Sequence, residues 1–423
     1  MKNKRLLLAG AFSLALIVGL TPLLSACGNS GNQVAKADQP LKIGMMNPLT
    51  GVAAEKGRPM ADGNLDAIKY INEELGGIDG HPIQVNSVDT EYKPATVVSL
   101  TKRFIDEGDL IFTTAASAEM TAAMPAANEA GLPGLSAYTS PNLYRPTQHI
   151  YGQTPDYGDD ALIFAQYFLK NIWKGTGKPK FALELLNNST GYGARDAFKA
   201  KADELGIEVL DPVFEHTATT TSEMDALTKI KALNPDVLYI SSTPAPAAVI
   251  IKNARDLGIN CTIGVGHAAM TSALVNLAGA SVVEGVYGVY PTVSWGENVP
   301  GMAKMTEYMQ KYHPADAGNM DYITSWAQSM IIAEILRNAV KNAGYDVLAK
   351  GGADAWKAIE TQGIQKLNYD VGGLQGPARY TPGDNRLSKS VRVFQVKSGT
   401  LTAVTGWEDA PLVKYEDYSW FGK

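Results

Sequence analysis

Cysteine is scarce in this chain of 423 residues, which holds only Cys27 and Cys261. If Cys27 is modified, as argued below, Cys261 has no partner for an intrachain disulfide, so burial of apolar side chains must stabilise the fold. Histidines are also few, and no two are three or four residues apart: His81, His149, His216, His267 and His313. This scatter does not match a metal-binding pair on a helix. We therefore expect no metal and no other cofactor.

Positive charge is in deficit as well. The formal net charge is −6, and it becomes −9 without residues 1–26, because that segment has three cations and no acid. An acidic chain is a poor partner for nucleic acid. Enzyme motifs are also missing: no G-x-S-x-G occurs, and Gly175 to Pro179 lacks the Ser or Thr of a phosphate loop. We expect a protein that is not an enzyme and binds no nucleic acid.

Long apolar runs are absent apart from residues 6–20, which are too short for a membrane span of about 20 residues. Lys2, Lys4 and Arg5 precede this run, and Leu24-Ser25-Ala26-Cys27 follows it. The order is typical of an export signal and resembles a bacterial lipoprotein signal, which implies cleavage after residue 26 and acylation of Cys27. An ordinary secretory signal with an incidental cysteine is the alternative. Polar residues 27–40 would form a flexible tether.

The remaining 397 residues, from Cys27 to Lys423, suit two domains rather than one. Short apolar runs alternate with segments of helical periodicity, which predicts an α/β fold with mostly parallel sheets. The tail differs, because residues 391–397 and 401–405 alternate around Ser398 and Gly399 as in a hairpin. The predicted strands are 41–45, 81–89, 110–113, 181–186, 207–214, 237–241, 261–265 and 283–287, and helices include 193–205, 222–233 and 247–257.

Short motifs recur in a fixed order along residues 41–407. They include Asn47 to Gly51, Gly76 to Gly80, Gly131-Leu132-Pro133, Thr139-Ser140-Pro141, Asn234-Pro235-Asp236 and Ala278-Gly279. This order resembles the type I solute-binding proteins of branched-chain amino acid transporters. The resemblance implies two doubly wound, Rossmann-like lobes around a ligand cleft, with three crossings between the lobes. Lobe 1 would comprise residues 41–157 plus 290–386, and lobe 2 residues 158–289 plus 387–423.

The same resemblance implies where a ligand carboxylate binds. Ser117 stands where the family places a serine at a helix N-terminus, which favours anions. Ala137 and Thr139 match the small residue and the threonine that follow the fourth strand. A plain helix N-cap for Ser117, and a turn-capping role for Thr139 before Pro141, are the alternatives.

Further ligand contacts are implied on both lobes. Tyr192 matches an aromatic residue that covers the ligand, although it could also pack between the lobes without touching it. Thr243 follows residues 237–241 at another lining position. Lys56 falls in the first loop, where the family often has an aromatic contact. It could be a solvated charge at the rim, or in a closed cleft it could meet an anionic end of the ligand. Tyr322, at the start of a long helix, could line the wall of lobe 1.

His267 departs from the family pattern. Amino-acid-binding relatives hold a carboxylate at this position against the ligand's ammonium group, and a neutral imidazole cannot supply that charge. The substitution favours an amine-free aromatic or aliphatic acid, or an amide, as the ligand. A slip of the alignment would instead make His267 an ordinary loop residue. If Asp321 pointed inward, it would supply the missing charge and restore an ammonium site.

These features predict a lipid-anchored, monomeric, extracytoplasmic binding protein of an ABC importer, which closes over a carboxylate-bearing solute and delivers it to permease subunits. A sensor that feeds a chemoreceptor or a kinase would use the same scaffold. An amide-binding protein of the same fold is a further alternative. A hydrolase is the rival from the enzyme class, and it would need a nucleophile and a base about 3 Å apart in the cleft.

Overall fold

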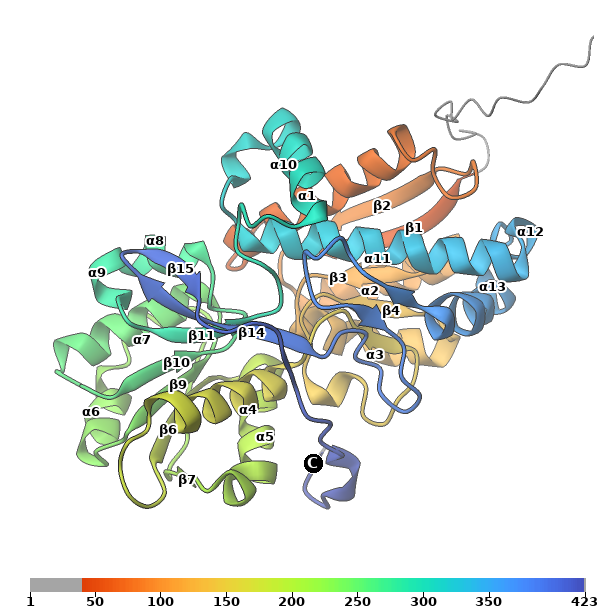
Figure 1. Cartoon of the computed structure of the whole chain (residues 1–423). Helices are drawn as coiled ribbons and strands as arrows, with labels where there is room; N and C mark the ends of the chain where they lie inside the picture. Colours follow the sequence, from red (N-terminus) through yellow and green to blue (C-terminus); the bar gives the residue numbers. More distant parts are fainter. Residues whose placement is uncertain (1–39, 422–423) are drawn as a thin grey trace, which may run out of the picture. The chain divides into compact units, whose positions relative to one another are not determined.

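The structure is a computed structural model, and it describes residues 40–421. The expected signal peptide, the acylated Cys27 and nearly all of the expected tether lie outside the described residues. Two β-sheets with flanking helices make up the described part of the chain (Figure 1). None of the helices in that part is both long enough and apolar enough to cross a bilayer.

The first sheet has five parallel strands in the order β2-β1-β3-β4-β5. Alternate residues of β1 reach opposite faces: Leu41 and Ile43 join one apolar cluster, whereas Met46 joins another. Its strands are β1 (Leu41–Asn47), β2 (Ile83–Asp89), β3 (Phe112–Thr114), β4 (Gly134–Ser136) and β5 (Ile150–Gly152). The helices between them are α1 (Ala54–Glu73), α2 (Pro94–Glu107) and α3 (Ser117–Ala130).

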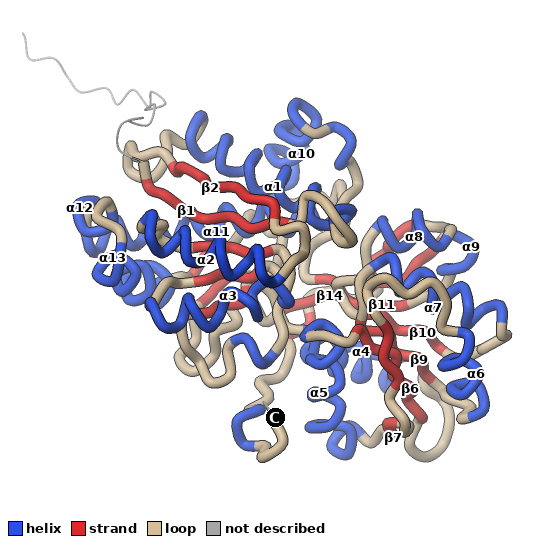
Figure 2. The backbone as a smooth tube through the Cα atoms, turned by 180° about the vertical axis from the view of Figure 1, so that it is seen from behind, coloured by secondary structure: helices blue, strands red, loops and turns tan. Residues whose placement is uncertain are grey.

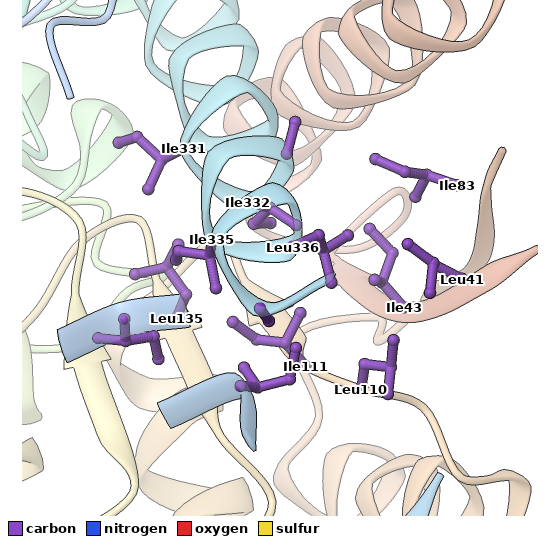
Figure 3. Close-up of a cluster of buried hydrophobic side chains, with 14 of the residues drawn as sticks. Leu41, Ile43, Ile83, Leu110, Ile111, Leu135, Ile331, Ile332, Ile335 and Leu336 are labelled. Carbon is purple, nitrogen blue, oxygen red and sulfur yellow. The ribbon is translucent and has the colours of Figure 1, made fainter. Parts of the chain in front are cut away.

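One face of this sheet is covered by α11 (Met320–Ala343), a helix far away in sequence. Figure 3 shows Ile332, Ile335 and Leu336 of α11 close to Ile43 and Ile111 of the sheet, and all five side chains are buried. Burial of side chains of this size contributes roughly 1.5–3 kcal/mol each. The apolar stripe of α11 therefore stabilises the sheet that carries half of the candidate site.

The second sheet has nine strands, with β15-β14-β11-β10-β9-β6-β7 as its main order. In β9 (Val237–Ser241), Leu238 and Ile240 pack with α6 (Met224–Ala232), α7 (Pro244–Asp256) and α8 (Ser272–Ala278). On the other face, Val237 and Tyr239 pack with α4 (Tyr157–Tyr167) and α5 (Ser189–Leu205). The sheet therefore has helices on both faces (Figure 2). Its strands are β6 (Lys180–Leu186), β7 (Glu208–Val209), β8 (Phe214–His216), β9 (Val237–Ser241), β10 (Thr262–Val265), β11 (Tyr287–Tyr290), β14 (Ser390–Lys397), β15 (Thr400–Ala403) and β16 (Glu408–Asp409).

The chain passes between the two sheets three times. It leaves the first sheet after β5, returns after β11 to form α10 and α11, and leaves again through residues 386–390 to form β14. The predicted α/β class with doubly wound, mostly parallel sheets is confirmed, while the boundaries assigned to the two lobes stay predictions.

Other helices are α4 (Tyr157–Tyr167), α5 (Ser189–Leu205), α6 (Met224–Ala232), α7 (Pro244–Asp256), α8 (Ser272–Ala278), α9 (Ala280–Val283), α10 (Pro300–Tyr312), α12 (Tyr345–Leu348) and α13 (Gly352–Ala358), and a small pair is β12 (Asn368–Tyr369) with β13 (Ala378–Arg379).

Two strand predictions are wrong. Residues 207–214 do not form one strand, because Pro212 lies between β7 and β8 and has no N–H for a ladder hydrogen bond. Residues 283–287 are not a strand either: Val283 ends α9, and Gly285 turns the chain with a φ of 79° before β11 begins. Both errors arose because apolar side chains stand on each side of a short turn, whose residues Asp211, Pro212 and Glu284 are exposed. The predicted hairpin matches β14 and β15 closely.

A buried ionic network holds the first and third passages together. Arg386 donates to both carboxylate oxygens of Asp159 in α4, at 2.6 and 2.7 Å, and also to Asp384. Arg145 donates to Asp384 at 3.0 Å. These two guanidinium groups hold the pKa of Asp384 at about 2, although burial alone would raise it. Beside them, Gly152 exchanges backbone hydrogen bonds with the segment 385–387.

Close contact between α1 and α11 leads to a first prediction. A Cβ atom at Gly63 in α1 would collide with the Ser325 hydroxyl and the Tyr322 carbonyl of α11. We expect Gly63→Ala to lower the free energy of unfolding by roughly 1–3 kcal/mol, because the two helices must move apart. Urea denaturation measures this change. Gly406→Ala is the control, since nothing lies within 4 Å of its added Cβ; equal losses in the two variants would contradict the packing argument.

Candidate ligand-binding site

The N-termini of two helices, α3 beside the first sheet and α5 beside the second, meet at the candidate site. Ser117 is the first residue of α3 and Ser189 is the first residue of α5, and their hydroxyl oxygens are 2.9 Å apart. The Thr190 hydroxyl lies 3.5 Å from that of Ser117. Ser117 is fully buried. Because helix N-termini favour negative charge, an anion between these two helices would interact with both sheets at once.

The start of α3 is fixed by a buried acid. The Glu119 carboxylate accepts a hydrogen bond from the backbone N–H of Ala116 at 3.2 Å and another from the Thr90 hydroxyl. Burial raises the pKa of Glu119 to about 7, although these two donors oppose that shift. Glu119 thus holds the loop after β3 in the conformation that presents Ser117.

A second polar group is built around Asp321 at the start of α11. Its carboxylate forms an ion pair with Lys56. The hydroxyls of Tyr138 and Tyr290 lie 2.6 and 3.0 Å from the same carboxylate and 2.7 Å from each other. The Lys56 Nζ atom also lies 4.2 Å from the centre of the Tyr138 ring. Asp321 does point inward, but Lys56 neutralises its charge, so it is not a free carboxylate for a ligand ammonium group.

His267 lies between the two sheets and is held by Asp160 of α4. Asp160 accepts from the backbone N–H of His267 at 2.9 Å, and its carboxylate is 3.0 Å from Nδ1. The imidazole ring is sandwiched by Tyr138 and Tyr157, with ring centres 4.6 and 4.7 Å away. Its Nε2 atom is buried and has no hydrogen-bond partner among residues 40–421. With the Nδ1 proton donated to Asp160, Nε2 of a neutral ring is an acceptor.

The structure brings several of the predicted contacts together. Ser117, Lys56 and His267 lie around the tyrosine pair Tyr138 and Tyr157. Ala137 is fully buried in a small apolar cluster with those same two rings, next to Met60, Ala115 and Ala268. A compact, buried group with polar and apolar walls therefore surrounds the meeting point of α3 and α5.

Other predicted contacts lie elsewhere or serve the framework. The Tyr322 hydroxyl donates to Asp66 at 2.7 Å and the ring packs against Trp295, so Tyr322 is turned toward α1. Thr139 is buried, but its hydroxyl is 3.5 Å from that of Tyr144. Thr243 is half-buried at the start of α7 and its side chain makes no capping hydrogen bond.

Tyr192 lines a separate cavity beside the group. Its ring is half-buried, and the Arg195 guanidinium lies 4.4 Å from the ring centre. The Tyr192 hydroxyl is 3.5 Å from a carboxylate oxygen of Glu215, which is at the limit of a hydrogen bond. Tyr192 therefore faces the mouth of the site rather than its buried interior.

The sequence did not identify four further residues of the site: Tyr138, Tyr157, Asp160 and Tyr290. Tyr138 stands between Ala137 and Thr139, and the family resemblance directed attention to these two neighbours. Asp160 is the third aspartate in the stretch 156–160, whose first member, Asp156, caps α4 by accepting from the N–H groups of Gly158 and Asp159. That capping pattern is visible in the sequence, but nothing in it links Asp160 to His267.

A second buried histidine bears on the hydrolase alternative. The His216 ring has Nε2 2.8 Å from the Ser242 hydroxyl and Nδ1 3.2 Å from the Glu184 carboxylate. All three side chains are fully buried or nearly so, so no substrate reaches this serine in the structure. Pro244 and Pro246 in the first turn of α7 also lack the N–H groups that would stabilise an oxyanion. The trio therefore acts as a hydrogen-bond chain that ties together the ends of β6, β8 and β9.

No group of three or more His, Cys, Asp or Glu side chains in residues 40–421 could hold a metal ion. Buried acids in this part of the chain have other partners: Asp321 pairs with Lys56, and Glu119 accepts from a hydroxyl and a backbone N–H. This pattern agrees with a site that binds through hydrogen bonds and ion pairs.

The raised pKa of Glu119 predicts a pH dependence of stability. The folded chain keeps this proton up to a pH of about 7, whereas the unfolded chain loses it near 4.5. Glu119 should therefore contribute a fall of about 3 kcal/mol in the free energy of unfolding as the pH rises through that window. Glu119→Gln should make the measured fall smaller by about this amount in urea denaturation at several pH values, while the share of Asp159, whose pKa is also raised to about 7, remains. Glu129→Gln, on the exposed side of the same helix, should keep the whole fall; parallel profiles for all three proteins would refute the assignment.

A family model and several known proteins match most of this chain. The model of a family described as periplasmic binding protein matches residues 40–400. Leu/Ile/Val-binding protein homolog 3 of Brucella melitensis is 24% identical, over 80% of this chain and 89% of that protein. Leu/Ile/Val-binding protein BraC3 of Rhizobium johnstonii is 25% identical, over 88% of this chain and 95% of its own length.

Solved structures share the fold at low identity. A branched-chain amino acid ABC transporter protein from Thermus thermophilus with bound valine has a TM-score of 0.78 at 19% identity, over 90% of this chain and 99% of that one. The substrate-binding protein LivJ from Streptococcus pneumoniae, in complex with isoleucine, has a TM-score of 0.70 at 20% identity, over 87% of this chain and 100% of that one. Both cover nearly the whole described fold. The family match spans most of the sequence, and the chain belongs to the periplasmic binding protein family.

Proposed function

We propose that this chain is the extracytoplasmic substrate-binding protein of an ABC importer, and that it captures an amino acid or a related carboxylate and delivers it to the permease. The observation that carries the proposal is the pair of helix N-termini at Ser117 and Ser189. The two helices flank different sheets, and the two serine hydroxyl oxygens are 2.9 Å apart. A carboxylate held there contacts both halves of the fold. Its binding free energy therefore favours the closed arrangement over an open one.

The ligand also carries an N–H donor. His267 offers a buried Nε2 acceptor without a partner among the described residues, and Asp160 fixes the proton on Nδ1. A buried acceptor left unpaired costs about 1–3 kcal/mol, and a ligand ammonium or amide group would remove that cost. This geometry revises the sequence-based preference for an amine-free acid. It agrees with the valine and isoleucine found in two proteins of similar fold.

The chain is held at the membrane through Cys27, in this proposal, by acyl chains on its first mature residue. The family implies a location outside the cytoplasm, and the leader motif at residues 24–27 supplies the attachment point. Two or more acyl chains anchor a protein firmly, because each buried methylene contributes about 0.8 kcal/mol. Tethering near the permease would raise the local concentration of the loaded carrier.

Three ligands test the site by calorimetry. Leucine should bind more tightly than 4-methylpentanoate, which lacks the amine, and more tightly than leucinamide, which lacks the carboxylate. Ser117→Ala should weaken leucine binding roughly tenfold or more, because a hydrogen bond to a charged group contributes about 1.5–3 kcal/mol. Ser329→Ala is the matched control, since Ser329 is equally buried but bonds Asn64 in α1. The proposal fails if none of a panel of amino acids and carboxylates binds, or if both serine variants bind leucine equally.

Two histidine variants test the acceptor. His267→Gln should lose most of the preference for leucine over 4-methylpentanoate. His216→Gln should keep that preference, because His216 is as buried and as close to a carboxylate but already bonds Ser242 through Nε2. Each variant's melting temperature is recorded so that lost stability is separated from lost selectivity. An unchanged preference in His267→Gln would remove this residue from the site.

Replacing Cys27 tests the anchor. The full-length chain, expressed in a bacterial host that exports it, should partition into the detergent phase of a cloud-point extraction. Cys27→Ser should move to the aqueous phase, whereas Cys261→Ser should stay with the detergent, because Cys261 lies at the start of β10 within the fold. Detergent partitioning of Cys27→Ser would rule out acylation at this residue.

A further inference from the structure

A cavity of about 640 Å³ opens beside the buried group, between α3 and α5. Ala118 and Thr121 of α3 line one side, and Tyr192, Arg195 and Lys199 of α5 line the other. Its volume is typical of sites that bind small molecules. Ser189 also contributes to the wall, so the cavity adjoins the candidate ligand site without including the buried Ser117.

The third wall of the cavity comes from the end of the chain. Trp420 and Phe421 line it, after the short 3-10 turn Tyr415–Asp417. This terminal segment is packed against the second sheet's helices: the Phe421 ring stacks on buried Tyr415 with ring centres 5.1 Å apart, and the Tyr418 hydroxyl donates to the carbonyl of Ala200 in α5 at 3.3 Å. The aromatic wall is therefore held in place by α5, opposite α3.

The lining combines aromatic faces with positive charge. Lys199 places its Nζ atom 4.5 Å from the centre of the Trp420 ring, and Arg195 lies over Tyr192 in the same way. Arg195 also forms an ion pair with Asp196 at 2.9 Å. Lys199 forms no ion pair with a carboxylate among the residues that the structure describes, although its charge opposes the rise that burial causes in the pKa of Asp196, which also lines the cavity. An ammonium group outside any direct ion pair and next to an indole face suits a ligand with a flat ring and one negative charge.

We propose that this cavity is a second small-molecule site, which binds an aromatic carboxylate. The ring of the ligand stacks against Trp420 and Tyr192, and its carboxylate pairs with Lys199. The proposal concerns this cavity alone and holds whatever ligand occupies the Ser117 site. Because the walls come from helices of both sheets, a bound aromatic acid also favours the closed arrangement. It should therefore tighten binding at the Ser117 site, and the coupling must be reciprocal.

The test uses the full-length chain in detergent, with indole-3-acetate as the probe and indole-3-acetamide as its uncharged match. Calorimetry should detect binding of the acetate and much weaker binding of the acetamide. Trp420→Ala and Lys199→Gln should each weaken indole-3-acetate binding roughly three- to tenfold, the size expected for one exposed stacking or charge contact. Neither side chain lies in the buried core, so both variants should fold.

Matched controls separate these effects from general changes of the surface. Trp407→Ala removes another exposed tryptophan, and Lys201→Gln removes a lysine of α5 that pairs with Glu204 instead. Both should bind indole-3-acetate as the wild type does. The titration is repeated with saturating leucine. Tighter binding supports a second site that is coupled to the Ser117 site, and unchanged binding overturns the coupling. Full competition by leucine, equal binding of the acetamide, or unchanged affinity in Trp420→Ala and Lys199→Gln overturns the second site itself. Leucine binding measured alone reports on the Ser117 site separately.

Discussion

The contact between Arg386 and Asp159 is the constraint on which the remainder of this structure depends. It joins the third passage of the chain between the sheets to the helix α4 that follows the first passage. The same helix carries Tyr157 and Asp160, which contact His267. A buried guanidinium group must be paired on all sides, and Asp159 and Asp384 supply that pairing. One paired cation thus fixes where the two sheets meet and how α4 presents the site.

The buried carboxylates of the candidate site each have hydrogen-bond donors close by. Lys56 pairs with Asp321, and Asp160 accepts from the backbone N–H and from Nδ1 of His267. Burying an unpaired charge costs free energy, whereas hydrogen-bonding groups that are already oriented cost less to bury and bind a polar ligand well. The site therefore offers helix N-termini and one imidazole acceptor to a ligand. A zwitterion that carries its own opposite charges suits such surroundings.

Prediction from sequence succeeded where a side chain's role follows from its local pattern. β1, α2 and the hairpin β14–β15 could be located because period-two or helical spacing of apolar residues is visible in a short window. Prediction failed where apolar residues on both sides of a turn resembled one strand, as at Pro212 and Gly285. Ser117 was placed correctly at a helix start, but its partner Ser189 could not be named, because pairing between two helix starts depends on how the sheets are oriented.

The sequence alone determined the alternation of strands and helices and the acidic charge of the chain, since each rests on composition or on neighbouring residues. The export leader and the lack of a cofactor stay predictions. Only the tertiary structure decided which charges meet. Lys56 and Asp321 are 265 residues apart, and Asp160 and His267 are 107 apart. Pairings over such separations are set by the packing of the two sheets and by the free energy needed to bury a lone charge. Neither can be predicted from a local sequence pattern.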